Sequence, residues 1–438
     1  MILTLLLACA VDPPPTDDSK PGGEQTIAGT DTSEPETTGE DETTAPPEEE
    51  PPEEEPPEEE PPEELPPPDT EWEDLSETYF SLDRVHTIDL QLPEDSLLSL
   101  VSDPYTEVPG DMELDGELFE DVNVRLKGKL GSFRSLRHKA GFKVDINDNV
   151  PGRTAMGQKK LNLNNMVQDC SCLHDRTAYL LYQAMGVSAP RVGYGWVTVN
   201  GEDYGLYALV EAYDDVFLEQ RYDQPDGNLY DGDYTLWENG DYSLADFEAS
   251  AQEFFKLSEG ADVGHADVHA VTEAISVGVQ AENFSEEVGA VVDLAQFQRF
   301  WATEVWVGQW DGYNYNKNNY RVYFNPETGL AELLPWDHDN AFYSGYIPLT
   351  APMGRLSAYC QIEDGECYAG FLDAVAQASA VVEDIGLLDE VYRTMALINP
   401  YIAVDPRMER DFASASECQA DLQNYIETRE IILEGWEL

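Results

Sequence analysis

Apolar and polar residues alternate along much of the chain between residues 84 and 210. A two-residue period is typical of strands that bury one face, and it predicts strands at 84–90, 119–127, 141–146, 191–199 and 204–210. Asn200-Gly201 joins the last two strands, and this dipeptide favours a two-residue hairpin turn. The short segment 161–164 fits either a strand or a loop. This part of the chain therefore predicts a small antiparallel sheet.

A helical period dominates the remainder. Apolar residues spaced by three and four positions predict helices at 175–185, 214–221, 246–258, 267–282, 293–309, 369–397 and 407–436. The Gly- and Asp-rich segment 226–238 predicts a loop instead. A strand at 319–324 and a turn at 325–329 interrupt the helices. The predicted order is thus strands first and helices second, with one strand pair inside the helical part.

Residues 1–78 differ in character, with 26 acidic residues and a single base, Lys20. Pro-Pro-Glu-Glu-Glu recurs from Pro51. The segment has few apolar residues, and burying them would not offset the conformational entropy lost when the chain becomes ordered. We expect residues 10–78 to form a disordered, inert spacer with polyproline II character. Residues 1–9 are an apolar run too short to span a bilayer. Their end, Leu-Leu-Ala-Cys9, resembles the lipobox of bacterial lipoproteins and predicts a lipid anchor on an extracytoplasmic protein.

The formal net charge of −64 limits the partners of the protein. Residues 79–438 hold 62 acids and 23 bases, and a surface this negative repels nucleic acid and anionic membranes. The only membrane contact we expect is the anchor on Cys9. The other cysteines are expected to oxidise in an exported protein, Cys360 with Cys367 and Cys418 with Cys170 or Cys172. No Cys-x-x-Cys spacing points to a structural zinc site.

The densest candidate chemistry lies between residues 311 and 339. Asp311 is followed by Asn316 and, after a strand, by Asp337 and Asp339. Protein kinases use such a series, in which a loop Asp precedes an Asn by five positions and a metal-binding Asp follows. Asp311 would orient or deprotonate an attacking hydroxyl, while the other three would hold Mg²⁺ or Mn²⁺ on a phosphate. The alternative is a solvated acidic loop, because Asp231-Gly-Asp233 has the same spacing as Asp337 and Asp339.

A second candidate site is basic. Ten of the 24 bases lie within residues 125–160, where only two acids oppose them. Phosphate accounts best for such a cluster in an acidic chain, with the backbone N–H groups of a Gly-x-x-Gly loop assisting. The alternative is a basic face that pairs with acidic surface elsewhere in the chain. The nucleotide-binding candidates are Lys143, which we prefer as the phosphate-pairing lysine, then Lys139, Arg125, Lys127 and Gly128.

Several motifs occur in an order that resembles one known family. They are Arg125-Leu-Lys-Gly, Phe142-Lys-Val-Asp, Lys160-Leu-Asn-Leu-Asn-Asn, Tyr204-Gly-Leu-Tyr, Trp310-Asp-Gly-Tyr and Pro335-Trp-Asp-His-Asp. Over residues 85–345 the chain is similar to the CotH (spore coat protein H-like) kinase family. The resemblance implies an atypical protein kinase that uses ATP and a divalent metal to phosphorylate Ser on secreted or coat proteins. It also implies that Asp311 is catalytic and that Asp337 binds metal.

Two positions depart from the pattern of kinases. The helix in which kinases place a Glu to pair with the strand lysine offers Asp175 here, which is one methylene shorter. Glu211 ends a strand near the place where the resemblance puts the adenine-binding hinge, so Glu211 joins the nucleotide-binding candidates.

The expected fold is therefore α+β and two-lobed like a protein kinase, with a small antiparallel sheet lobe at 79–212 and a mostly helical lobe at 213–438. The expected function is ATP- and metal-dependent transfer of phosphate to Ser, or another hydroxyl, of an extracytoplasmic or surface protein. The alternatives are a catalytically inactive kinase-like coat, surface or adhesion protein and a calcium-stabilised scaffold. The kinase hypothesis requires Lys143, Asp311, Asn316 and Asp337 to converge on one cleft.

Overall fold

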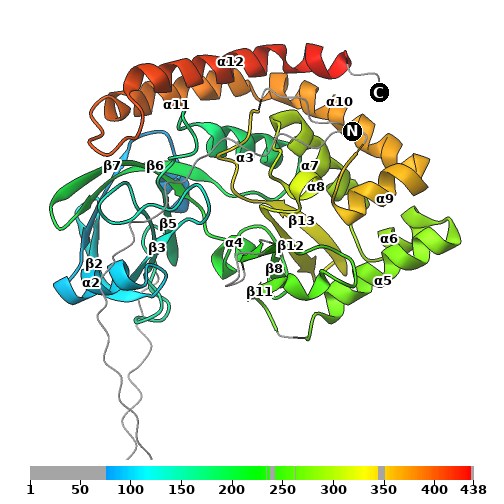
Figure 1. Ribbon diagram of the computed structural model, residues 1–438, viewed down its shortest axis with the longest axis horizontal. Helices are drawn as coiled ribbons and strands as arrows, with labels where there is room; N and C mark the ends of the chain where they lie inside the picture. Colours follow the sequence, from blue (N-terminus) through cyan, green and yellow to red (C-terminus); the bar gives the residue numbers. More distant parts are fainter. Residues whose placement is uncertain (1–74, 233, 237–241, 262, 344–350, 436–438) are drawn as a thin grey trace, which may run out of the picture. The chain divides into compact units, whose positions relative to one another are not determined.

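The computed structural model describes residues 75–435 except 233, 237–241, 262 and 344–350 (Figure 1). These residues belong to one unit, Asp69–Leu438. The predicted lipobox at 1–9 and the predicted spacer up to residue 74 lie outside the described residues. The last residues of that spacer are folded, because helix α1 (Ser76–Tyr79) buries both of its terminal side chains.

The first half of the unit is a closed β-barrel. Its hydrogen-bonded strand order is β1-β2-β3-β4-β5-β7-β6, and a parallel pairing of β6 with β1 completes the circle. The strands are β1 (His86–Gln91), β2 (Val108–Leu114), β3 (Glu117–Lys127), β4 (Gly141–Asp145), β5 (Lys160–Asn164), β6 (Val192–Val199) and β7 (Glu202–Val210). The helix α2 (Glu94–Ser102) packs beside β2.

Alternation along the strands separates an apolar barrel interior from a polar exterior. On β3, Val122, Val124 and Leu126 point inward and are at most 1% exposed, whereas Arg125 and Lys127 between and beside them are partly exposed. Aliphatic and aromatic side chains from all seven strands fill the interior. Because side chains on a strand alternate between faces, the basic residues of β3 are carried on the outside of the barrel.

Closure of this sheet overturns the expected fold class. The sequence predicts a small antiparallel sheet lobe like that of a protein kinase, whereas the structure has a closed barrel with one parallel pair, so that prediction is wrong. Local alternation reveals individual strands, and the predicted hairpin of β6 and β7 is present. The closing pair, however, places His86 opposite Gly195. Contacts between residues so far apart in sequence leave no trace in a local pattern.

A four-stranded sheet of order β11-β8-β12-β13 lies in the second half. Its strands are β8 (Asn228–Asp231), β11 (Lys256–Glu259), β12 (Tyr320–Asn325) and β13 (Leu330–Pro335), and the short strands β9 (Thr235–Leu236) and β10 (Tyr242–Ser243) pair with each other. Two predictions are corrected here. The loop expected at 226–238 contains β8, and the helix expected at 246–258 is a single 3₁₀ turn, η1 (Gln252–Phe254), followed by β11. Both strands have four residues, too few for a clear periodicity.

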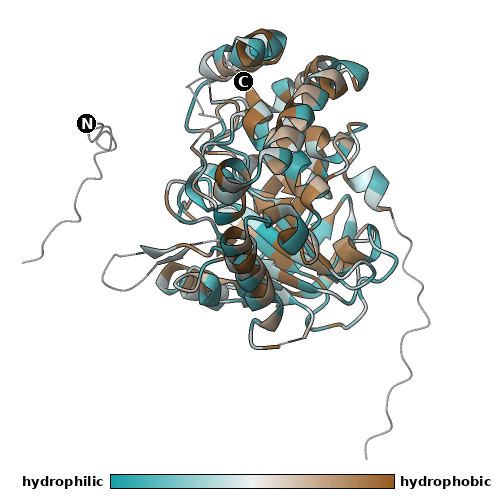
Figure 2. Cartoon of the chain, turned by 90° about the vertical axis from the view of Figure 1, so that its right-hand side faces the viewer, coloured by the Kyte–Doolittle hydropathy of each residue, from teal (hydrophilic) through white to brown (hydrophobic). Residues whose placement is uncertain are grey.

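Helix α7 (Leu294–Val307) forms the centre of the second half. It packs along α10 (Gly365–Asp384), where the Trp301 ring stacks on Phe371 with centroids 3.7 Å apart. Figure 2 shows apolar stretches on the helices and strands in the middle of the unit. The remaining helices are α3 (His174–Ala184), α4 (Asp215–Glu219), α5 (Ala266–Ala281), α6 (Phe284–Gly289), α8 (Tyr313–Asn316), α9 (Arg355–Glu363), α11 (Leu387–Ile402) and α12 (Phe412–Glu434). No helix among the described residues has the length and apolar character needed to cross a membrane.

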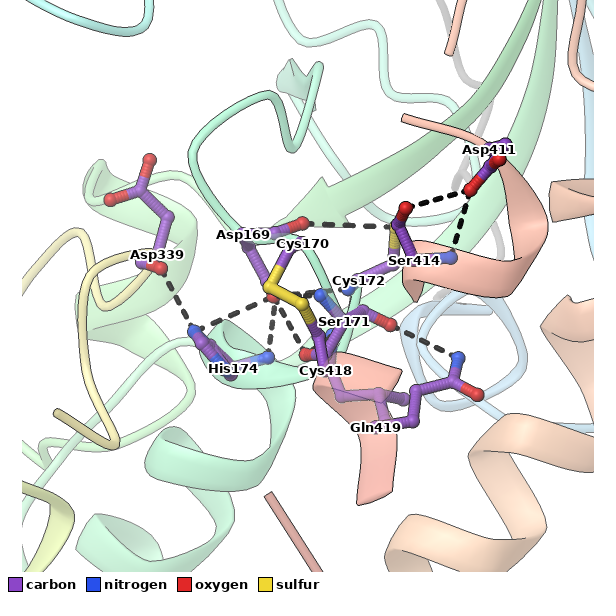
Figure 3. The surroundings of a disulfide bond; sticks show 11 residues. Asp169, Cys170, Ser171, Cys172, His174, Asp339, Asp411, Ser414, Cys418 and Gln419 are labelled. Carbon is purple, nitrogen blue, oxygen red and sulfur yellow. Dashed lines mark hydrogen bonds and ion pairs between the residues drawn. A yellow bond between two sulfur atoms is a disulfide. The ribbon is translucent and has the colours of Figure 1, made fainter. Parts of the chain in front are cut away.

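The last two helices connect the second half to the barrel. They run along the top of Figure 1, and α11 packs on α3 and β7. The disulfide Cys170–Cys418 attaches α12 to the segment before α3 (Figure 3). The predicted disulfide between Cys360 and Cys367 is also present, and Cys172 is buried and forms no disulfide within the described part of the chain.

Candidate active site

A cavity of about 810 Å³ opens against the outer face of the barrel. Residues of the barrel strands β3, β4 and β5 line it, together with residues of the segments 310–319 and 336–340. Eight of the residues predicted from the sequence line it: Arg125, Lys127, Gly128, Lys143, Asp311, Asn316, Asp337 and Asp339. The structure therefore brings the basic and the acidic candidates together in one place.

The barrel contributes a basic wall to the cavity. Arg125 on β3 pairs in register with Lys143 on β4, and Lys143 pairs with Asn162 on β5, so these side chains stand side by side on the outer face. Burial and the neighbouring Arg125 charge lower the pKa of Lys143. Lys129 lies over the Tyr234 ring at 4.8 Å, and burial lowers its pKa to about 8. The wall therefore carries several basic side chains that are partly removed from water, and an anion bound there would favour their charged forms.

Lys127, on the same wall, contacts residues of both sides of the cavity. Its side chain crosses Gly141, where an added Cβ would lie 2.9 Å from Lys127 Cγ, so a larger residue would block its path. The ammonium lies 5.6 Å from the centre of the Trp336 ring and donates a hydrogen bond to Asn164 Oδ1. Burial lowers the pKa of Lys127 to about 8, although Asp337 and Asp175 oppose this effect. A glycine on β4 thus directs a lysine of β3 toward the acidic side.

Asp311 is the most heavily hydrogen-bonded carboxylate of the acidic wall. Asn316 donates to its Oδ1, and Asn318 and Asn319 donate to its Oδ2 at 3.3 and 3.2 Å. Burial raises the pKa of Asp311, and the nearby Asp337 adds to this rise, while the three amides lower it. The amides hold both carboxylate oxygens in place and leave them as acceptors.

The loop after Asp311 is shaped by Glu304, a buried residue of α7. Its carboxylate accepts hydrogen bonds from the backbone N–H groups of Tyr313 at 2.9 Å and Asn314 at 3.0 Å. Gly312 lies so close to this carboxylate that no side chain would fit there. Glu304 was not predicted as a site residue, although a single Glu within the apolar run of α7 is a signal that could have found it.

Asp337 and Asp339 lie on the turn that follows β13. The Asp337 N–H donates to Tyr179 Oη at 3.0 Å, and Gln309 donates to the Asp337 carbonyl at 2.8 Å. His174 donates to the Asp339 carbonyl at 2.9 Å, as Figure 3 shows. Burial raises the pKa of Asp337, and burial followed by the charges of Asp337 and Asp175 raises the pKa of Asp339 well above its usual value. The turn thus concentrates negative charge that a cation would stabilise.

Asp175, the α3 residue that replaces the Glu of kinases, joins the same group. Burial and Asp337 raise its pKa to about 7. One of its oxygens accepts from Asn164 Nδ2 at 3.2 Å and the other from the His338 N–H at 2.8 Å. Asn164 therefore stands between Lys127 and Asp175, a role that the sequence analysis did not foresee.

Two nucleotide-binding candidates lie elsewhere. Lys139 forms a buried ion pair with Asp405, and its ammonium lies 4.8 Å from the centre of the Tyr207 ring. Glu211 is 1% exposed and forms ion pairs with Arg191 at 2.6 Å and Arg221 at 2.5 Å. Neither side chain lines the cavity, because each forms ion pairs with residues of other segments.

The donor set fits a divalent cation that also contacts phosphate. Within the described ranges no group of three or more His, Cys, Asp or Glu residues is arranged to hold a metal alone. Mg²⁺ bound with a nucleotide needs only one or two carboxylates, because phosphate and water supply the remaining oxygens. Burial raises the pKa of Asp337, and burial with the charges of Asp337 and Asp175 raises the pKa of Asp339, so a cation bound here would favour the ionised form of both carboxyls.

Comparison with known proteins agrees with this geometry. The family described as CotH kinase protein matches residues 124–359, which are more than half of the chain and include every residue placed above on the acidic and basic walls. The chain belongs to the CotH kinase protein family. The resemblance seen in the sequence motifs is thereby confirmed.

Two proteins illustrate the relationship. Inner spore coat protein H of Bacillus subtilis (strain 168) is 23% identical over 296 residues, which cover 63% of this chain and 78% of that protein. A chain of the Shewanella oneidensis MR-1 toxin–antitoxin complex of HipA, HipB and operator DNA is 12% identical, covers 79% of this chain and 73% of its own, and has a TM-score of 0.28. A likeness this low carries no argument about fold or function.

Proposed function

We propose that this CotH family member is a phosphotransferase that moves the terminal phosphate of ATP to a Ser, or another hydroxyl, side chain of a protein. The observation that carries the proposal is the pair of opposed walls, basic from the barrel and acidic from residues 311–339, around a single cavity of about 810 Å³. A triphosphate with a divalent cation complements both walls, because phosphate oxygens pair with the lysines and the metal pairs with the carboxylates.

The barrel residues supply phosphate binding in this proposal. Lys127, Lys143 and Arg125 offer charged donors to phosphate oxygens, and Gly128 begins the loop that leaves the basic wall. Asn316, Asp337 and Asp339 would hold Mg²⁺ or Mn²⁺, which when bound offsets the negative charge of the phosphates. Lys139 and Glu211 take no part, because both are held in ion pairs outside the cavity.

Asp311 is the proposed catalytic residue. Its oxygens are fixed by three asparagine amides, and burial raises its pKa, which makes the carboxylate a stronger base. The acceptor hydroxyl would give its proton to Asp311 as its oxygen forms the new bond to phosphorus and ADP departs. Positioning the hydroxyl and receiving its proton are thus assigned to one group.

The setting of the reaction is also a proposal. By its name the relative from Bacillus subtilis is a protein of the spore coat, which supports a surface or coat location for this chain. We add to it the lipid anchor on Cys9, an extracytoplasmic location and a protein partner that carries the acceptor Ser. The competing proposal is a catalytically inactive coat or adhesion protein, for which the same cavity would bind no nucleotide.

The test uses the full chain, ATP labelled on its γ-phosphate, Mn²⁺ and dephosphorylated casein as a Ser-bearing acceptor. Wild type should label the acceptor, and Asp311→Asn should lower the rate at least about 100-fold, the usual loss when general-base catalysis is removed. Asp215→Asn is the control, because Asp215 pairs with Lys159 outside the cavity.

Calorimetric titration with ATP and Mn²⁺ separates binding from catalysis. Wild type and Asp311→Asn should both release heat on binding. No binding by wild type would favour the inactive coat protein, whereas full transfer by Asp311→Asn would remove Asp311 from its catalytic role.

A further inference from the structure

An amide connects Lys127 to Asp175 where a direct ion pair is absent. The Lys127 ammonium donates to Asn164 Oδ1, and Asn164 Nδ2 donates to Asp175 Oδ2 at 3.2 Å. The described carboxylates include no ion-pair partner of Lys127 within 4.0 Å. Asn164 hydrogen-bonds both side chains and so lies between them.

The orientation of the Asn164 amide follows from its neighbours. Lysine has only donors and an ionised carboxylate only acceptors. Turning the amide around would place its NH₂ group against the ammonium, a donor against a donor, and would remove the hydrogen bond that Asp175 now accepts from Asn164 Nδ2. The side chain therefore has a single favourable arrangement.

Both ends of this bridge are anchored. At one end, Lys127 crosses Gly141, which leaves room for no other side chain on that part of β4. At the other end, Asp175 is 7% exposed and its Oδ1 accepts from the His338 N–H at 2.8 Å. The bridge thus runs from the basic wall to the turn that carries Asp337 and Asp339.

We propose that Asn164 is a positioning residue that fixes the Lys127 ammonium in the cavity by linking it to Asp175. The inference rests on the proposed function, because a fixed cation at this place serves to bind the phosphates of a nucleotide. One of the three ammonium donors is used by Asn164, and the other two are available to phosphate oxygens. The amide does for the short Asp175 what a longer acid would do by direct contact.

Three variants test this arrangement with a non-hydrolysable ATP analogue and Mn²⁺. Asn164→Ala removes the bridge and should raise the Kd of the analogue and the KM for ATP roughly tenfold, the loss expected for one charged hydrogen bond. The value of kcat at saturating ATP should change much less. Asp175→Glu should weaken binding in the wild-type background, because the longer acid displaces the amide. The same substitution should restore binding in the Asn164→Ala background, where Glu reaches Lys127 directly.

The matched control is Asn123→Ala. Asn123 lies on the outer face of β3 like Lys127, but its amide donates to Asp148 at 2.6 Å and it does not line the cavity. This variant should bind the analogue as wild type does. A purely structural role for Asn164 would lower the melting temperature and the active fraction, and Asp175→Glu would then worsen the Asn164→Ala variant.

A second measurement needs no nucleotide. Lys127 is acetylated with acetic anhydride, and the rate is followed by peptide mass spectrometry. The rate should be higher in Asn164→Ala than in wild type, and lower again in the double variant Asn164→Ala with Asp175→Glu. Equal rates in all three proteins would overturn the positioning role, whether or not ATP binds. Absence of nucleotide binding by wild type would instead overturn the proposed function, and the order of acetylation rates would still decide the role of Asn164.

Discussion

Glu304 shows, at the scale of one residue, how burial shapes the candidate site. Its carboxylate is 1% exposed and holds the loop after Asp311 through the N–H groups of Tyr313 and Asn314. Burial raises the pKa of Glu304 from 4.5 to about 8. The folded protein therefore keeps this carboxyl protonated over a pH range in which the unfolded chain ionises it.

This shift predicts a pH dependence of stability. The contribution of Glu304 is fully present below pH 4.5 and is lost as the pH rises through about 8, because folding then retains a proton that the unfolded chain releases. Glu304→Gln removes the ionisation, so thermal melts between pH 5 and pH 8 should show a flatter fall in Tm than wild type. The exposed Glu366→Gln should keep the wild-type slope. A variant slope equal to that of wild type would contradict the prediction.

At the scale of elements, the loop between α11 and α12 binds the barrel through hydrogen bonds and an ion pair. The Asp405 carboxylate accepts from the Leu206 N–H at 2.9 Å and pairs with Lys139, and both charged side chains are at most 2% exposed. Arg407 donates to the carbonyls of Leu136 at 2.9 Å and His138 at 2.8 Å. The ion pair with Asp405 therefore holds the Lys139 ammonium at the contact between this loop and the barrel, and Lys139 does not line the cavity.

The buried pair predicts non-additive mutational effects. Lys139→Met leaves Asp405 charged and unpaired, which should lower the free energy of unfolding by about 3–5 kcal/mol. The double variant Lys139→Met with Asp405→Leu should lose less, because no buried charge remains without a partner. Chemical denaturation of the two single variants and the double variant measures this coupling. Losses that simply add would show that the two side chains do not stabilise the barrel contact together.

The folded Lys139→Met protein also tests the nucleotide-binding role that the sequence predicts for Lys139. Its affinity for ATP should equal that of wild type, since Lys139 does not line the cavity.

At the scale of the whole molecule, one covalent bond joins the barrel side of the unit to its C-terminal helix. Cys170 and Cys418 are 248 positions apart, whereas Cys360 and Cys367 are seven apart. Asp169, next to Cys170, accepts hydrogen bonds from the N–H groups of Ser171 and His174 at the start of α3 (Figure 3). The long-range disulfide thus holds α12 against the segment that leads into the site.

The two disulfides should contribute unequally to stability. A cross-link restricts the unfolded chain more when it closes a longer loop, and the contribution is typically about 2–4 kcal/mol. Replacing Cys170 and Cys418 by Ser should therefore lower Tm more than replacing Cys360 and Cys367, as measured by calorimetry. An equal or reversed order would show that the local disulfide stabilises the folded state by other means.

Some parts of this protein follow from short-range sequence patterns. The β6–β7 hairpin is fixed by a turn dipeptide and the alternation beside it, and the Cys360–Cys367 pairing by their closeness. The series from Asp311 to Asp339 identifies the acidic wall because the residues that build it are close in sequence. The motifs that reveal the family are equally local.

Only the tertiary structure decided which distant residues meet. The pairing of β1 with β6 closes the barrel, although no pattern in either strand indicates it. Lys139 and Lys127 are similar as sequence, yet one is neutralised by Asp405 and the other crosses Gly141 to Asn164. The sequence by itself determined which chemical groups are present and which short elements carry them. Their partners were decided by packing, because a buried charge is costly unless the fold places an opposite charge or a hydrogen-bonding group beside it.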